Sequence, residues 1–199
     1  PAVKAVADNL FATGQKPTRF LDPQSRPVVY GTDGADALSP NPVLGDPYLK
    51  NYLPNGVVLI GGKGNDTLGG GGINDSLLGG AGDDQLYDGL GNDSLLGGAD
   101  KDTYYISGGN DIITDDGLKD RINGYTGTAV ETETDSGIYK LNGATVTQSG
   151  GTLNIQRTNG TISVTSYSSG DYGILLEKKG KPEIDPPAAP ISPIALDIG

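Results

Sequence analysis

Aspartate residues recur at intervals of nine along the middle of the sequence, and an apolar residue follows each one two positions later. The aspartates are Asp66, Asp75, Asp84, Asp93, Asp102, Asp111 and Asp120, and the apolar residues are Leu68, Leu77, Leu86, Leu95, Tyr104, Ile113 and Ile122. Carboxylates are the charged oxygen ligands that Ca²⁺ prefers in proteins. The fixed spacing therefore predicts one small unit, stacked repeatedly, that carries a row of cation ligands.

The composition agrees with cation binding and excludes several kinds of chemistry. The formal net charge is −11, and like charge repels nucleic acid and anionic lipid. The chain has no histidine and no cysteine, which excludes Ser-His-Asp and Cys-His catalysis and His-ligated zinc. No apolar run reaches the roughly 20 residues that span a bilayer. We expect calcium ions as partners, no nucleic acid, no membrane insertion and no catalytic residue in this chain.

The residues around the aspartates specify turns and short strands. From residue 61 onward, the first six positions of each nonapeptide are rich in glycine, which tolerates the positive φ of tight turns. The last three positions favour a short strand whose middle side chain points inward. Two nonapeptides then make one coil of about eighteen residues, and the seven apolar residues fill its interior.

The segments GGKGNDTLG, GGGINDSLL and GGAGDDQLY show the pattern most clearly. They resemble the calcium-binding nonapeptide G-G-x-G-x-D-x-U-x of RTX (repeats-in-toxin) haemolysin-type proteins. The resemblance covers residues 61–123, with one outlying unit at 31–39. It implies a calcium-loaded parallel β-roll. Because the alternation beyond residue 124 favours a small antiparallel β cap after the roll, we expect an all-β chain.

The stacking predicts how many calcium ions the roll holds. Ca²⁺ needs six to eight oxygens, more than one turn supplies, so each ion should bridge one unit and the second unit after it. Turns that start at 61, 79, 97 and 115 then share one edge, and those that start at 70, 88 and 106 share the other. Three ions on the first edge and two on the second give about five sites.

The family resemblance implies a ligand set for each site. It consists of both aspartates, the second and fourth carbonyls of one turn, and the first and third carbonyls of the next turn on that edge. The carbonyls belong to Gly62, Gly64, Gly79 and Ala81; Gly80, Gly82, Gly97 and Ala99; Gly71, Ile73, Asp88 and Leu90; and Gly89, Gly91, Ile106 and Gly108. The pairs Asp66–Asp84 and Asp84–Asp102 match best. The pair Asp102–Asp120 matches least, because Asp100 and Leu118 replace the fourth-position glycine.

The sequence divides into four parts. Residues 1–29 are expected to form an N-terminal arm with one short helix, and residues 30–124 the β-roll, with an insertion at 40–56. Residues 125–178, whose polar and apolar residues alternate, are expected to form the antiparallel cap. Within the cap, the Asn159-Gly160 pair favours a type I′ hairpin turn that places Ile155 opposite Val164. Residues 179–199 are expected to be a proline-rich linker and a truncated further module.

The expected function is a calcium-binding RTX β-roll segment of a large exported bacterial protein. By resemblance, such a segment folds on calcium binding after type I secretion, so the chain is expected outside the cell or at its surface. It is expected to be monomeric and flanked by other domains. Two alternatives stay open: the non-catalytic C-terminal part of an RTX lipase or similar hydrolase, and a spacer or ligand-binding module of an RTX adhesin.

Overall fold

The computed structural model describes residues 21–40, 54–114, 120–133, 136–168 and 170–179. The described residues form sixteen β-strands and a 3₁₀-helix, η2 (Asp171–Gly173). None of their helices is long and apolar enough to cross a membrane. The predicted N-terminal helix, most of the predicted insertion and the proline-rich C-terminal segment lie outside the described residues.

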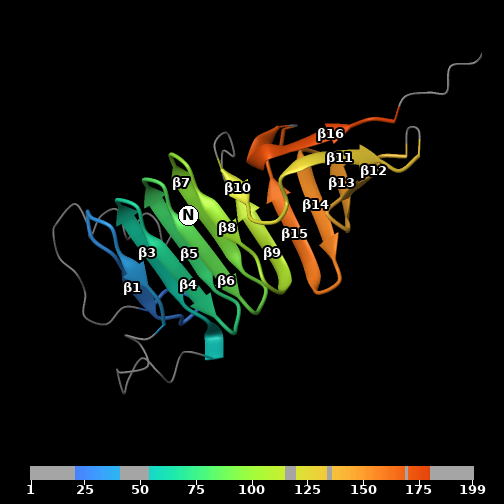
Figure 1. Ribbon diagram of the computed structural model, residues 1–199. Helices are drawn as coiled ribbons and strands as arrows, with labels where there is room; N and C mark the ends of the chain where they lie inside the picture. Colours follow the sequence, from blue (N-terminus) through green and yellow to red (C-terminus); the bar gives the residue numbers. More distant parts are fainter. Residues whose placement is uncertain (1–20, 41–53, 115–119, 134–135, 169, 180–199) are drawn as a thin grey trace, which may run out of the picture.

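Two parallel sheets form the walls of a flattened coil, and the chain passes from one wall to the other at every turn (Figure 1). Between residues 58 and 122, neighbouring strands of each wall pair at an offset of 18 residues, as in Ser76 with Ser94 and Gln85 with Thr103. This offset confirms that two nonapeptides make one coil. One wall contains β3 (Val58–Lys63), β5 (Ser76–Ala81), β7 (Ser94–Ala99) and β9 (Gly109–Thr114); the other contains β4 (Thr67–Gly71), β6 (Gln85–Gly89), β8 (Thr103–Tyr105) and β10 (Arg121–Ile122).

The outlying unit belongs to the same roll. Strand β1 (Val28–Tyr30) pairs with β3, and β2 (Ala37–Leu38) pairs with β4, both in parallel. The register joins Val28 to Val58, an offset of 30 residues, 12 more than in the later coils. Strand β1 also begins inside the range predicted to be the N-terminal arm.

The interior of the coil is a column of apolar side chains. All seven apolar residues that follow the aspartates are fully buried, which confirms their inward orientation. Leu77 lies in register with Leu95, and Leu86 with Tyr104, so each side chain packs on its counterpart one coil away. Burial of one such side chain contributes about 1.5–3 kcal/mol. The strands of five or six residues are longer than the predicted three, because they continue into the first positions of the next turn.

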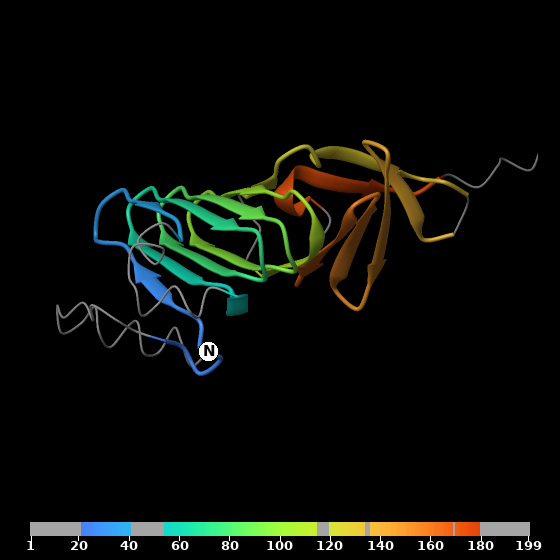
Figure 2. The same ribbon diagram turned by 90° about the horizontal axis from the view of Figure 1, so that it is seen from below.

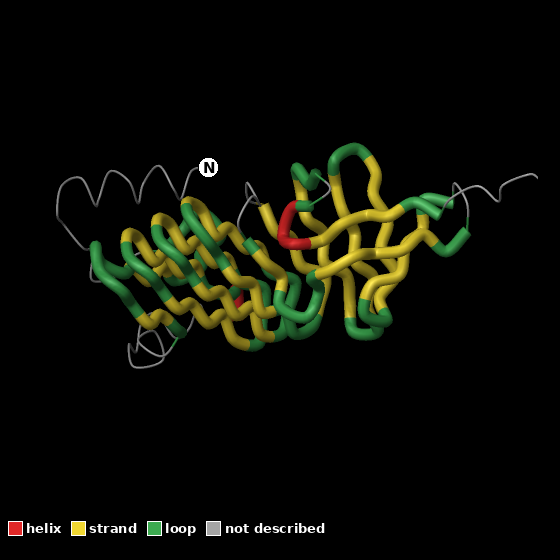
Figure 3. The backbone as a smooth tube through the Cα atoms, turned by 45° about the horizontal axis from the view of Figure 1, so that its top comes forward, coloured by secondary structure: helices red, strands yellow, loops and turns green. Residues whose placement is uncertain are grey.

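The cap lies end to end with the roll and shares a sheet with it (Figures 2 and 3). Its strands are β11 (Gly127–Glu131), β12 (Ile138–Leu141), β13 (Ala144–Ser149), β14 (Thr152–Arg157), β15 (Gly160–Thr165) and β16 (Ile174–Glu177). Strands β11 to β15 pair antiparallel in chain order. Strand β15 runs parallel to β9, and β16 runs parallel to β11. The apolar core therefore continues from the roll into the cap.

The predicted register of the β14–β15 hairpin is wrong by two residues. Ile155 lies opposite Ile162, and Leu153 lies opposite Val164. Arg157 pairs with Gly160, so the two residues of the turn are Thr158 and Asn159. Gly160 is instead the first residue of β15, where a Cβ would lie 1.6 Å from the carbonyl oxygen of Gly109. The shift of two residues leaves each apolar side chain on its predicted face.

Candidate metal centre

The repeated aspartates form a ladder of buried carboxylates along each edge of the roll. The Oδ1 atom of Asp84 accepts the backbone N–H of Asp66 at 2.7 Å, and that of Asp102 accepts the N–H of Asp84 at 2.8 Å. On the other edge, Oδ1 of Asp93 accepts the N–H of Asp75 at 2.7 Å. The same bond joins the pairs Asp93–Asp111 and Asp102–Asp120. Each carboxylate is thereby fixed in orientation against the preceding coil.

The second carboxylate oxygen carries the evidence for a cation. The Oδ2 atoms of Asp66, Asp75 and Asp93 are buried and have no hydrogen-bond partner among the described residues. A buried anionic oxygen without a partner is costly, and native structures pair such groups or bind an ion beside them. The three oxygens therefore predict positive charge at both edges.

For Asp66 and Asp75, this oxygen faces the first glycine of its turn, together with a carbonyl of the next coil. The turn of Asp93 begins with Asp88 instead. A Cβ on Gly61 would lie 2.3 Å from Oδ2 of Asp66 and 2.5 Å from the carbonyl oxygen of Gly79. A Cβ on Gly79 would lie 2.2 Å from Oδ2 of Asp84 and 2.7 Å from the carbonyl oxygen of Gly97. Glycine keeps these places free of side-chain atoms, so carboxylate and carbonyl oxygens converge there.

Several of the predicted carbonyls lie between successive turns of one edge. In three places, the third carbonyl of one turn accepts the fourth N–H of the preceding turn on that edge. These bonds, at 2.8–3.2 Å, join Ala81 to Gly64, Ala99 to Gly82, and Gly108 to Gly91. Second-position carbonyls of Gly71 and Gly89 accept N–H groups of the next turn, from Leu90 and Gly108. Three further carbonyls lie against a glycine of the next coil. They are the second-position carbonyl of Gly62 against Gly80, that of Gly80 against Gly98, and the fourth-position carbonyl of Ile73 against Gly91. A carbonyl oxygen has two lone pairs, so one N–H bond leaves it able to bind a cation.

The donor set fits calcium. It consists of carboxylate and carbonyl oxygens, which hard cations prefer, and offers no imidazole or thiolate, which zinc prefers. The aspartate carboxylates would hold the ions, together with the first-position carbonyls of Gly79, Gly97 and Asp88. A bound ion would neutralise the stacked carboxylates and tie adjacent coils together.

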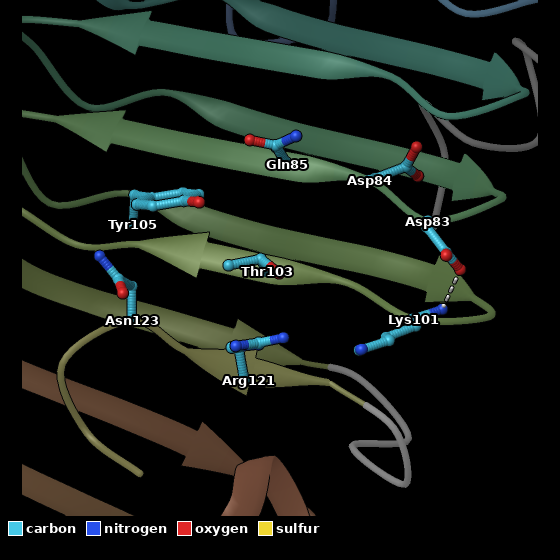
Figure 4. Close-up of a pocket in the computed structure, with 8 residues that line it drawn as sticks. All are labelled: Asp83, Asp84, Gln85, Lys101, Thr103, Tyr105, Arg121 and Asn123. Carbon is cyan, nitrogen blue, oxygen red and sulfur yellow. Dashed lines mark hydrogen bonds between the residues drawn. The ribbon is translucent and has the colours of Figure 1, made fainter.

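A third ladder runs along the outer surface, where the fifth turn positions lie. Asn65 accepts the backbone N–H of Asp83 at 3.0 Å, and Asp83 accepts that of Lys101 at 3.1 Å. Figure 4 shows this second bond at the rim of a shallow pocket over β6, β8 and β10, with Gln85, Thr103 and Arg121 side by side on the strands. The side chains of Asn65 and Asp83 therefore link successive turns without taking part in the carboxylate ladder.

Three features of the centre were missed from the sequence. Asp66 Oδ1 accepts the N–H of Asp36 at 2.8 Å, which adds a sixth carboxylate pair to the five predicted. Asp36 already stood at the repeat position of the outlying unit, but the long insertion hid its register. The side chain of Asp88 was not predicted to be a ligand, and neither was any role for Arg157. Both of these departures lie at the same end of one edge.

Asp88 adds a third carboxylate to the site of Asp93 and Asp111. Ligand oxygens of the three side chains lie within 4.8 Å of one another. Asp88 is fully buried, and its Oδ1 accepts the N–H groups of Gly89 at 2.5 Å and Ser107 at 2.9 Å. Burial raises the pKa of Asp88 to about 6 and that of Asp93 to about 7. This cluster therefore brings three carboxylates together where the other sites have two.

We expect Asp88→Asn to weaken calcium binding at this cluster by about tenfold, because one of three close negative charges is lost. Isothermal titration calorimetry with calcium measures the change. Asp83→Asn is the matched control, since it removes the same charge from an exposed turn position outside the carboxylate ladder. Equal affinities in the two variants would contradict a ligand role for the Asp88 side chain.

Calcium affinity and the stability of the metal-free chain should respond to pH with opposite signs. Burial raises the pKa of Asp75 from the ordinary value of 3.8 to about 6. The pKa values of Asp88 and Asp93, about 6 and about 7, are raised in the same way. Protons therefore compete with calcium, and affinity should fall as pH falls through 7 to 6. Without metal, the folded state binds more protons than the unfolded state, so its stability is greatest below 3.8 and is lost as pH rises through 6 to 7.

Circular dichroism at a series of pH values, with calcium and with chelator, measures both trends. We expect a chelator-treated sample to show more β structure near pH 5 than near pH 8, and a calcium-saturated sample to keep its structure at pH 8. The same pH dependence in both samples would contradict the assignment of these carboxylates to the ion sites.

Comparison with known proteins identifies the repeats. The model of the RTX calcium-binding nonapeptide repeat, in four copies, matches residues 58–77, 69–104 and 78–113. No curated protein matches the sequence. Among solved structures, the extracellular lipase LipA from Serratia marcescens aligns with 75% of this chain, at 19% identity and a TM-score of 0.29. The chain spans 21% of that lipase. The aspartate register, the 18-residue coil and the family match together identify residues 58–113 as RTX calcium-binding nonapeptide repeats, which form a parallel β-roll.

Proposed function

We propose that this chain is a calcium-dependent folding unit, whose roll forms when calcium ions bind along its two edges. The observation that carries the proposal is the row of buried carboxylates, three of which have a buried oxygen with no partner in the described part of the chain. Stacked carboxylates repel one another, and glycine-rich turns lose much conformational entropy on folding. Bound divalent ions would offset both costs.

The proposed sites lie in two rows. One row consists of Asp66–Asp84, Asp84–Asp102 and Asp102–Asp120, preceded by Asp36–Asp66, and the other of Asp75–Asp93 and Asp93–Asp111. Five ions would add ten positive charges to a chain of formal charge −11. This near-neutralisation supports a count of five or six ions. The metal-binding residues are the aspartates and turn carbonyls named above.

Isothermal titration calorimetry with calcium, and separately with magnesium, tests the proposal. We expect calcium to bind at several sites per chain with a large heat of coupled folding. Magnesium should not replace it, because Mg²⁺ demands octahedral geometry and gives up its water reluctantly. Absence of calcium binding, or equal folding with magnesium, would contradict the proposal.

We further propose that the chain belongs to an exported bacterial protein and works outside the cell. Calcium-dependent folding supports this location, since the chain would stay unfolded where calcium is scarce and fold where it is millimolar. In this role the chain supplies structure and catalyses no reaction. Fractionation of cultures that express the natural protein tests the location, and its retention in the cytosol would contradict it.

A further inference from the structure

The side chain of Arg157, from the end of β14, lies buried against the last described turn on one edge of the roll. Its Nη1 donates to the carbonyl oxygens of Ile106 at 3.3 Å and Ser107 at 3.2 Å. Its Nη2 donates to the carbonyl oxygen of Gly109 at 3.4 Å and to Oδ2 of Asp111 at 3.1 Å. The side chains of Arg157 and Asp111 are 5% and 0% exposed. Both terminal nitrogens of the guanidinium thus donate to oxygens of this turn.

These oxygens are the ones that a further ion would use. In each earlier turn on this edge, the proposed ligands shared with the next coil are the second and fourth carbonyls and the aspartate. Ser107, Gly109 and Asp111 hold those three positions in the turn at 106–111. The carbonyl of Ile106 was predicted to be a ligand of the preceding ion. Arg157 therefore contacts a complete half-site.

The hairpin of β14 and β15 in the cap occupies the position that a further coil of the roll would take. Strand β15 pairs with β9 where the next coil would pair, and Ile162 lies in register with Asp111, so this place has no carboxylate. Gly109 donates its N–H to the carbonyl of Asn159 at 3.0 Å. Thr161 donates its N–H to Oδ1 of Asn110 at 3.2 Å, just as Asn110 donates to Asn92 one coil earlier. The hairpin reproduces the backbone contacts of a coil but not its calcium ligands.

Charge distinguishes this place from the earlier sites. The Oδ2 atoms of Asp75 and Asp93 have no partner in the described part of the chain, whereas Oδ2 of Asp111 is paired with Arg157. The three carboxylates of Asp88, Asp93 and Asp111, together with one guanidinium, carry a net charge of −2. One divalent ion at the Asp93–Asp111 site would neutralise this group.

We propose that the guanidinium of Arg157 stands in the place of a calcium ion at the end of this edge. The cap then docks on the roll through a resident positive charge, and this last half-site takes up no calcium. The inference rests on the proposed calcium-dependent folding. It assigns Arg157 as a positioning residue that sets the number of ions and joins cap to roll.

Arg157→Gln tests the inference, because it removes the charge and frees the half-site. The slope of unfolding free energy against the logarithm of calcium concentration gives the number of ions taken up on folding. We expect Arg157→Gln to need more calcium for folding and to take up about one ion more than the native chain. Arg157→Lys, which keeps a positive charge, should show the native number. Arg121→Gln, at an exposed position on β10, is the control and should also show it.

The native ion number in Arg157→Gln would overturn the inference, because Arg157 would then form an ordinary ion pair between cap and roll. Failure of Arg157→Gln to fold in saturating calcium, while Arg157→Lys folds, would overturn it too, since calcium could not then replace the guanidinium. A native chain that folds with no uptake of calcium would overturn the calcium-dependent folding, and this inference with it. The slope of the native chain separates these cases.

Discussion

Chelation of calcium is expected to abolish hydrogen-exchange protection throughout strands β3 to β10. The coils pair with one another, and the turns between them bring together five pairs of buried carboxylates and a sixth pair of the half-buried Asp36 with Asp66. Two unit charges about 4 Å apart repel by about 4 kcal/mol where the effective dielectric constant is about 20. Several such pairs would exceed the 5–15 kcal/mol by which domains of this size are usually stable.

Hydrogen-exchange mass spectrometry with and without calcium measures this loss by region. The antiparallel strands β12, β13 and β14 serve as an internal reference, since their backbone bonds involve no repeat turn. We expect the largest change in peptides that contain Asp66 to Asp102 and a smaller change in those of the reference strands. Equal protection of the roll in calcium and in chelator would contradict the proposed coupling of folding to metal.

Gly79→Ala is expected to remove the ion shared by Asp84 and Asp102. The new Cβ would lie 2.2 Å from Oδ2 of Asp84 and 2.7 Å from the carbonyl oxygen of Gly97, in the place where the ligands converge. Gly79 does not have a positive φ, so the substitution introduces no backbone strain. Overpacking of this kind costs about 1–3 kcal/mol, or about a 5- to 150-fold loss of calcium affinity.

Gly72→Ala is the matched control for this variant. Gly72 also lies in a repeat turn and also lacks a positive φ, but a Cβ there would have no heavy atom within 4 Å. Calcium titration by calorimetry should show one fewer tight site in Gly79→Ala and the native number in Gly72→Ala. The same loss in both variants would indicate a general effect on the turns and contradict a specific site at Gly79.

The roll could be predicted in detail because every coil repeats the same physical solution. One carboxylate and one apolar residue per nine positions determine which side chains point inward, which turns share an edge and which strands pair. Leu77, Leu86 and Leu95 occupy the predicted interior, and the 18-residue register follows from the same spacing. Glycines such as Gly80 and Gly98 follow from the same stacking, since the backbone of the adjacent coil leaves no room for a Cβ there.

Features that depend on one contact between distant segments could not be predicted. Arg157 and Asp111 are separated by 46 residues, and no pattern in either segment relates them. The register of the hairpin depends on the close approach of Gly160 to Gly109, so the local preference of Asn-Gly for a turn was overridden. The contribution of Asp36 depends on its register with Asp66, 30 residues later, and composition does not reveal that register.

The number and position of calcium ions in the folded chain test the central claim most directly. A crystal structure in the presence of calcium, with anomalous scattering data, would locate each ion. We predict five or six ions in two rows, each between successive aspartates on one edge, and none in the half-site of Ser107, Gly109 and Asp111 that Arg157 occupies. Two or fewer ions, or ions away from the aspartate ladders, would contradict the account.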